Sequence, residues 1–157
     1  MVWPVLVHSA RTAMAAVASL LVARLFGLPA TYWAPITTLV ITQSSLGAAF
    51  TVSWQRFVGT ALGALVGAIV ASQLRPHVLV FATCVFILGL LCAVAHSDRS
   101  AYRFGGVTLA IVLLVPRTGS EWRIAFHRFA EVTVGIRVAL ILEWVWPERE
   151  ETPYGKS

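Results

Sequence analysis

Charged residues are scarce in this chain. Asp, Glu, Lys and Arg make up 12% of its 157 residues, against roughly 25% in soluble globular domains, while 58% of the residues are hydrophobic and the mean hydropathy is +0.79. A balance this apolar excludes an ordinary soluble domain and indicates an integral membrane protein. At about 20 residues for each spanning helix, the chain has room for five or six spans and for little else.

Lysine and cysteine are rare as well. Lys156 is the sole Lys, so eleven of the twelve basic residues are Arg. Arg suits bidentate binding of carboxylates, although anchoring at the membrane interface explains the same preference. Cys84 and Cys92 lie in one apolar run, too far apart along a helix to form a disulfide. The basic residues are dispersed and form no basic stripe, which argues against nucleic acid as a partner.

The common enzyme motifs are missing from the sequence. It contains no GxxxxGK[ST], GxSxG, HExxH or CxxC pattern. His127 and Glu131 stand four residues apart, but two ligands do not make a metal site, which needs three or four. We therefore expect no enzymatic activity, no cofactor and no bound metal.

Apolar runs separated by Gly, Pro and polar turns predict an all-α membrane protein of about six helices. The second and fifth runs are short, so we expect the second and fifth helices to be short or broken. Residues 48–56 are predicted to lie along the membrane interface before the third span. Residues 1–147 would form the transmembrane domain and residues 148–157 a short polar tail. The expected helices are residues 5–28 or 9–28, 32–41, 57–74, 78–95, 102–115 and 124–146.

Polar side chains and glycines interrupt the apolar stretch of residues 32–68. Lipid cannot satisfy hydrogen-bonding groups, so such side chains must face protein or water. Glycines at four-residue steps strip one helix face of side chains and let a second helix approach closely. The polar side chains are Thr37, Thr38 and Gln43, and the glycines are Gly59, Gly63 and Gly67.

The same stretch resembles the membrane signature of the fusaric acid resistance and aromatic acid exporter family, with the plant aluminium-activated malate transporters as more distant relatives. The likeness is good over about residues 9–75 and weaker from there to Pro147. Ser44 departs from it, since the family often has Pro there. The length departs too, since typical exporters have two such membrane halves and a cytoplasmic domain. The residues that carry the resemblance are YWAPIT at 32–37, Leu39-Val40, Gln43, Ser45, Gly47, Gln55-Arg56, Gly59-Thr60 and Gly63.

This resemblance implies a function and a location. It implies a multi-pass protein of the bacterial inner membrane with both termini in the cytoplasm, acting as a homodimer or pairing with a similar chain. It also implies efflux of small organic anions such as aromatic carboxylic acids, driven by an ion gradient because the sequence has no ATP-binding motif. A passive anion channel and a non-transporting membrane assembly subunit are the alternatives.

Ionisable residues concentrate in residues 124–146. Arg137 lies near the centre of this run, where a charge is costly, and on a helical wheel it points away from Arg128 and Glu131. Either the arginines draw a carboxylate inward, or Arg128 pairs with Glu131 and Arg137 with an acid elsewhere. The candidate solute contacts are Trp33, Thr37, Thr38, Gln43, Arg56, Arg128 and Arg137, and the candidate proton carriers are Glu131, Glu143 and His127.

A weak internal repeat is also present. WQRF at 54–57 with Gly63 resembles FHRF at 126–129 with Gly135. Two repeats of three helices would run in opposite directions across the bilayer, as in many secondary transporters. Chance similarity between apolar segments is the other explanation.

Overall fold

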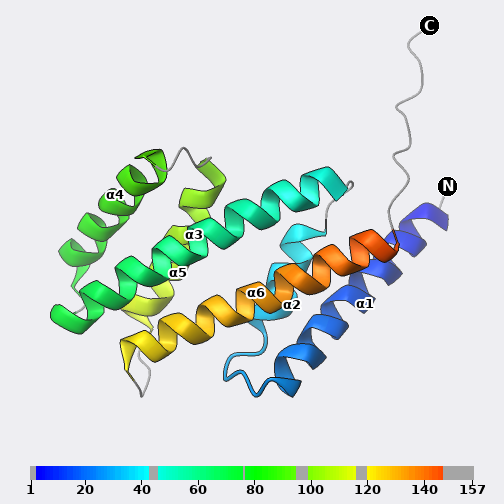
Figure 1. The fold of residues 1–157 in the computed structure, drawn as a ribbon, viewed down its shortest axis with the longest axis horizontal. Coiled ribbons are helices and arrows are strands. Elements are labelled where there is room, and N and C mark those ends of the chain that lie inside the picture. Colours follow the sequence, from blue (N-terminus) through cyan, green and yellow to red (C-terminus); the bar gives the residue numbers. More distant parts are fainter. Residues whose placement is uncertain (1–2, 43–45, 76, 95–98, 116–119, 147–157) are drawn as a thin grey trace, which may run out of the picture.

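The computed structural model describes residues 3–42, 46–75, 77–94, 99–115 and 120–146. Within these ranges the chain forms six helices and no strand, which confirms the predicted all-α fold. The helices are α1 (Trp3–Leu25), α2 (Trp33–Ile41), α3 (Leu46–Gln73), α4 (Val78–Val94), α5 (Arg99–Leu114) and α6 (Glu121–Val145) (Figure 1).

A glycine ends the first helix. Gly27 has a φ of 62°, a left-handed conformation that residues with a side chain rarely adopt. The N–H of Leu28 donates to the carbonyl of Ala23 at 3.1 Å, and the N–H of Gly27 donates to that of Arg24 at 2.9 Å. These two bonds form a Schellman motif, which satisfies carbonyls that the helix leaves open. α1 therefore ends at Leu25, shortly before the predicted end at residue 28.

The second helix is as short as predicted. α2 has nine residues, and at about 1.5 Å of rise per residue it cannot cross a hydrocarbon core about 30 Å thick. It ends at Ile41, and Thr42 has an extended conformation. Gln43, on which part of the predicted site rests, lies outside the described residues.

The third helix begins earlier than predicted. Residues 48–56, expected as a segment separate from the third span, belong to α3, which runs without interruption from Leu46 to Gln73. Arg56, the last residue of this stretch, has its side chain buried against other helices. α5 also begins at Arg99, earlier than the predicted residue 102, and α6 at Glu121, earlier than the predicted residue 124.

The two longest helices organise the bundle. α3 and α6 cross the centre side by side in opposite directions, with α4 and α5 beside α3 and with α1 and α2 beside α6 (Figure 1). α3 contacts α5, α4 and α6, while α6 contacts α2, α1 and α3. Contacts of α1 with α2, α1 with α6 and α2 with α3 are matched by those of α4 with α5, α4 with α3 and α5 with α6. The first half of the chain comprises α1, α2 and α3, and the second half comprises α4, α5 and α6. Exchanging each helix for the one in the same place in the other half turns each of these contacts into its counterpart.

Glycines bring backbones together at corresponding places in the two halves. A Cβ at Gly63 would collide with the backbone of Gly105 on α5, and one at Gly59 would collide with that of Ala101. A Cβ at Gly135 on α6 would likewise collide with α2, at the Ala34 carbonyl. Farther along α3, a Cβ at Gly67 would lie 3.0 Å from the side chain of Val112. The α3–α5 and α2–α6 contacts therefore depend on glycine.

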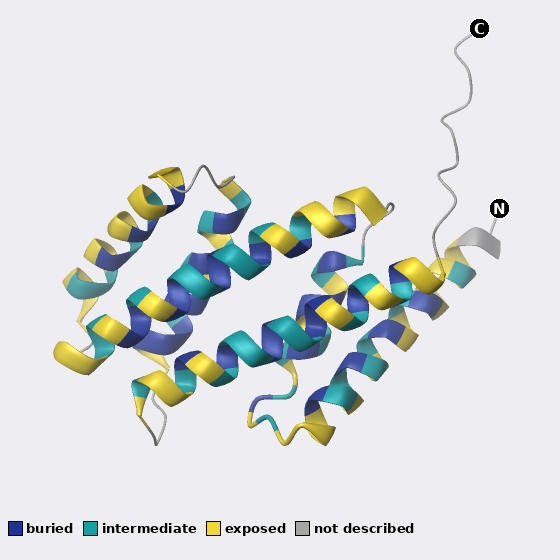
Figure 2. Cartoon of the chain, in the orientation of Figure 1, coloured by how far each residue is buried: buried dark blue, intermediate teal, exposed yellow. Residues whose placement is uncertain are grey.

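The outer surface of the bundle is apolar. Buried residues face the inside of the bundle, whereas much of the outer surface of every helix is exposed (Figure 2). Large exposed hydrophobic residues occur on all six helices, for example Leu21, Leu65, Phe86 and Ile141. Two of the described helices, Val5–Leu25 and Leu46–Gln73, are long and apolar enough to cross a membrane, and Val78–Val94 is a shorter apolar helix. An exposed apolar surface of this extent requires lipid or protein to cover it.

Candidate functional site

Arg56 lies inside the bundle with neutral neighbours. It is 6% exposed, and its Nε donates to Oγ1 of Thr37 on α2 at 3.2 Å. Its Cζ lies 4.9 Å from the centroid of the Phe104 ring on α5, within the range of a cation–π interaction. It forms no ion pair with another residue that the structure describes. A hydroxyl and a ring thus solvate the Arg56 charge without cancelling it.

Arg128 on α6 faces both an aromatic ring and an acid. Its Cζ lies 3.6 Å from the centroid of the Trp33 ring on α2, and its Nη1 lies 3.9 Å from Oε2 of Glu131. Glu131 is 1% exposed, and its Oε1 accepts a hydrogen bond from the N–H of Ala30 at 3.0 Å. Arg128 therefore has a counter-ion one helical turn away, which also anchors the chain just before α2.

The short helix α2 is where these polar contacts meet. Trp33 faces Arg128 and Thr37 binds Arg56, one helical turn farther on. Oγ1 of Thr38 lies within donor distance of the carbonyls of Ala34, at 3.0 Å, and Gly135, at 3.1 Å. Thr37 and Thr38 are fully buried, so protein groups satisfy them. The structure thus brings Trp33, Thr37, Thr38, Arg56, Arg128 and Glu131 together around α2.

A second buried ion pair ties the first helix to the last. Nη2 of Arg11 lies 3.0 Å from Oε1 of Glu143, and its Nη1 donates to the carbonyl of Trp146 at 2.7 Å. Both charged residues are 1% exposed. Glu143, a predicted proton carrier, is held in this pair. Sequence reasoning missed Arg11, because no spacing rule connects residues that are 132 positions apart.

Two other predicted residues lie apart from this cluster. Arg137 is exposed on the side of α6 opposite the buried Gly135 and Glu131, as the helical wheel indicated. His127 is half-buried with its ring 6.2 Å from that of Phe126, and its Nδ1 has no hydrogen-bond partner among the described residues.

Two hollows of the bundle lie away from α2. One lies between α4 and α5. The other, of about 210 Å³, lies between α3 and α6, and Ser53 lines it with a buried hydroxyl that has no hydrogen-bond partner in the described part of the chain. The remaining residues that line the second hollow are Phe50, Trp54, Phe57, Ile136 and Leu140.

Six helices, an apolar outer surface and buried charges define a helical membrane protein. The family model described as fusaric acid resistance protein-like matches residues 15–142, so the chain belongs to that family. It is 33% identical over 154 residues to the inner membrane protein YeeA of Escherichia coli, covering 92% of this chain and 42% of that protein. It is 27% identical over 153 residues to the uncharacterized transporter YdhK of Salmonella typhimurium, covering 92% and 22%. The chain therefore spans less than half the length of these relatives. No solved structure matches it.

Proposed function

We propose that this chain forms the membrane part of a transporter that exports small organic anions, such as aromatic carboxylic acids, using an ion gradient. The family and the transporter name of one relative support transport in general. The observation that carries the choice of an anion is Arg56, a buried charge with only neutral neighbours among the described residues.

The energetics of Arg56 favour an anionic solute. An arginine in the middle of a membrane costs about 2.5–3.5 kcal/mol on insertion scales. A carboxylate beside Arg56 recovers part of this cost, because a guanidinium forms short, charge-assisted and often bidentate bonds to it. The rings of Phe104 and Trp33 add aromatic surface near the two arginines. A neutral solute gains less from the charge, and a cationic solute is repelled by it.

We also propose that the two halves form an inverted repeat. The matched helix contacts and the opposite directions of α3 and α6 support this arrangement (Figure 1). Arg56 and Arg128 lie at corresponding positions, each beside an aromatic ring on the middle helix of a half. Inverted repeats can open in turn to either side of the membrane around a central site.

The proposal includes a second membrane half. The chain spans 42% of one relative and 22% of the other, so both relatives have room for a second membrane half. Arg137 is exposed on a helix that otherwise shows apolar side chains such as Ile141 and Trp144. A charge facing lipid at this depth is costly, so we place a second copy, or a similar chain, over this side of α6.

The experiment is efflux of a panel of radiolabelled aromatic carboxylates from cells that make the chain. We expect Arg56→Gln to slow efflux at least about tenfold, since a hydrogen bond to a charged group contributes about 1.5–3 kcal/mol. Arg56→Lys should retain part of the rate. Arg75→Gln is the matched control, because Arg75 is exposed just after α3. Equal efflux by Arg56→Gln and wild type, at equal protein levels, would refute the anion assignment.

Coupling is tested in proteoliposomes. Export should depend on an imposed proton gradient and should weaken when the predicted carriers Glu131, Glu143 and His127 are replaced one at a time. Conductance that persists without any gradient would favour a passive channel. Absence of both efflux and conductance, with normal association of copies, would favour an assembly subunit.

A further inference from the structure

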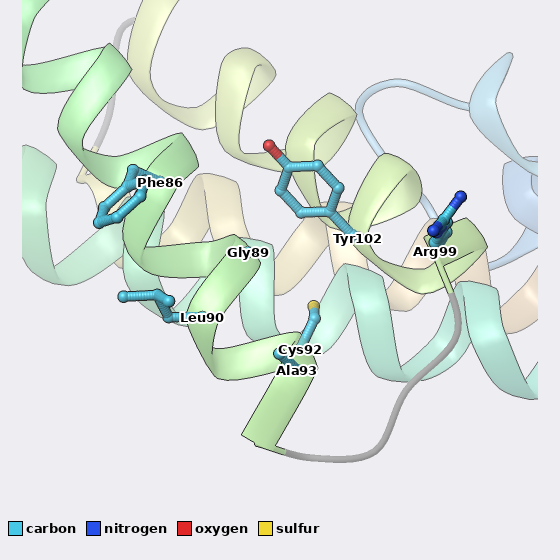
Figure 3. A pocket seen from close by; sticks show the side chains of 7 residues that line it. All are labelled: Phe86, Gly89, Leu90, Cys92, Ala93, Arg99 and Tyr102. Carbon is cyan, nitrogen blue, oxygen red and sulfur yellow. The ribbon is translucent and has the colours of Figure 1, made fainter.

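The hollow between α4 and α5 has a charged end and an apolar end. Its volume is about 390 Å³, within the range of roughly 300–1,000 Å³ that is usual for small-molecule sites. Figure 3 shows Arg99 at the start of α5 on one side, Phe86 and Leu90 of α4 on the other, and Tyr102 between them. A ligand that fills this space must carry both a polar group and an apolar part.

Small residues on α4 keep the hollow open. Gly89 and Ala93 form part of its wall, together with Cys92. A side-chain carbon at Gly89 would lie 3.4 Å from the Tyr102 ring, so the missing side chain leaves the ring in direct reach of the helix backbone. The wall of the hollow is mostly carbon, and Arg99 supplies its charge.

The charged end lies where two helices leave the apolar layer. α4 ends at Val94 and α5 begins at Arg99, so Arg99 stands at the polar boundary of both helices. Arg103, one turn farther along α5, is exposed as well, and Arg99 forms no ion pair with another described residue. Basic pockets between helices at this depth attract the head groups of anionic lipids.

We propose that this hollow binds an anionic phospholipid, with the phosphate at Arg99 and an acyl chain along Phe86 and Leu90. Phe86 is 67% exposed and Leu90 is 53% exposed, so the apolar end opens outward, toward the surrounding bilayer. An acyl chain enters from that side without leaving the lipid. A single-ring acid would fill less of the apolar end. The site does not depend on the transport proposal, because it shares no residue with the cluster around α2.

The test measures lipid retained by the full chain in mild detergent, using native mass spectrometry. Phosphatidylglycerol and phosphatidylcholine are added at equal concentration, and we expect wild type to retain phosphatidylglycerol preferentially. Arg99→Gln should weaken its retention about fivefold, the effect of one basic contact to an anionic lipid, and leave phosphatidylcholine unchanged. Ala93→Trp should fill the hollow and reduce both. Arg103→Gln is the matched control and should stay within about twofold of wild type.

Four outcomes would overturn the proposal. Equal losses in Arg99→Gln and Arg103→Gln would mean diffuse attraction to a basic surface. Equal retention of both lipids by wild type would mean that the charge is not recognised. Displacement of phosphatidylglycerol by benzoate, but not by a phosphatidylglycerol with shorter acyl chains, would identify the hollow as an organic-acid site. If Arg99→Gln loses helical content by circular dichroism, Arg99→Lys replaces it, and loss of the lipid despite the retained charge would count against the site.

Discussion

Arg56 and Arg128 occupy corresponding places in the two halves, yet among the residues that the structure describes only Arg128 has an acid beside it. Each guanidinium lies beside a ring, Phe104 for Arg56 and Trp33 for Arg128. Three residues after Arg128 stands Glu131, 3.9 Å away between charged atoms. Three residues after Arg56 stands Gly59, where a side chain would collide with the backbone of α5.

The difference shows that one position cannot serve two purposes. On α6 it carries the carboxylate of Glu131, which balances a buried charge. On α3 it carries glycine, which lets α5 approach and leaves Arg56 with neutral groups among its described neighbours. In the proposed transporter, the charge that attracts a solute is therefore Arg56, in the half where glycine occupies this position.

The largest effect on stability is expected at the ion pair between Arg11 on α1 and Glu143 on α6. α4, which takes the place of α1 in the second half, has no charged residue. Glu143→Gln removes the negative charge facing Arg11 while the guanidinium stays buried, and should lower the free energy of unfolding by about 3–5 kcal/mol. The double variant with Arg11→Gln should recover most of this loss. Denaturant unfolding in detergent micelles measures both, with Glu121→Gln at the partly exposed start of α6 as control. Equal stability of Glu143→Gln and wild type would show that the pair contributes nothing.

A smaller loss of stability is expected at glycines that occupy corresponding positions in the two halves. Gly63→Ala and Gly135→Ala should each cost about 2–3 kcal/mol, near the upper end for overpacking, because the added carbon meets backbone atoms that cannot rotate away. Gly106→Ala is the matched control, since nothing lies within 4 Å of a carbon added there. Thermal unfolding of the purified variants provides the measurement. If Gly135→Ala lowered the stability and Gly63→Ala did not, the two glycines would not play corresponding roles in the two halves.

Glu131→Gln makes the second half resemble the first. The amide oxygen can still accept the Ala30 N–H, but Arg128 loses the negative charge beside it. We expect a cost of about 1.5 kcal/mol, at the low end for hydrogen bonds to charged groups, since the two charged atoms are 3.9 Å apart. Chemical unfolding measures it, with Glu131→Ala as the comparison that removes both contacts. A cost as large as that of Glu143→Gln would contradict this ranking.

The smallest effect on stability is expected at Arg137. Its side chain is exposed, so Arg137→Gln should change the unfolding free energy of the isolated chain by less than about 0.5 kcal/mol. Association is the informative measurement, because the proposed second copy covers this side chain. Cross-linking in native membranes should then report a changed fraction of paired chains, whereas an unchanged fraction would remove Arg137 from the interface.

Helix positions were largely predictable because hydropathy and helix-breaking residues act locally. The fourth helix was expected at residues 78–95 and is observed at Val78–Val94. Residues 48–56 were not expected to be part of the third helix, because Arg56 interrupts the apolar stretch. Its actual surroundings, Thr37 and Phe104, come from other helices, and a hydropathy profile contains no information about them.

The candidate site was predictable only where its contacts are local. A spacing of three residues on a helix indicated that Arg128 and Glu131 could pair, and the structure places them together. Trp33 was expected to contact a solute, and in the structure its ring packs against the Arg128 guanidinium. Contacts between helices of different repeats depend on the tertiary packing, which the spacing of residues along one helix does not determine.

The glycine contact between α3 and α5 limits how this bundle can change shape. Side chains accommodate a displacement by changing rotamer, but two backbones in contact have no such freedom. α3 and α5 must therefore move as one rigid unit, and by the same reasoning so must α2 and α6. A change of shape that leaves both pairs intact is possible along the boundary between α3 and α6, where Phe57 meets Phe129 with ring centroids 5.0 Å apart.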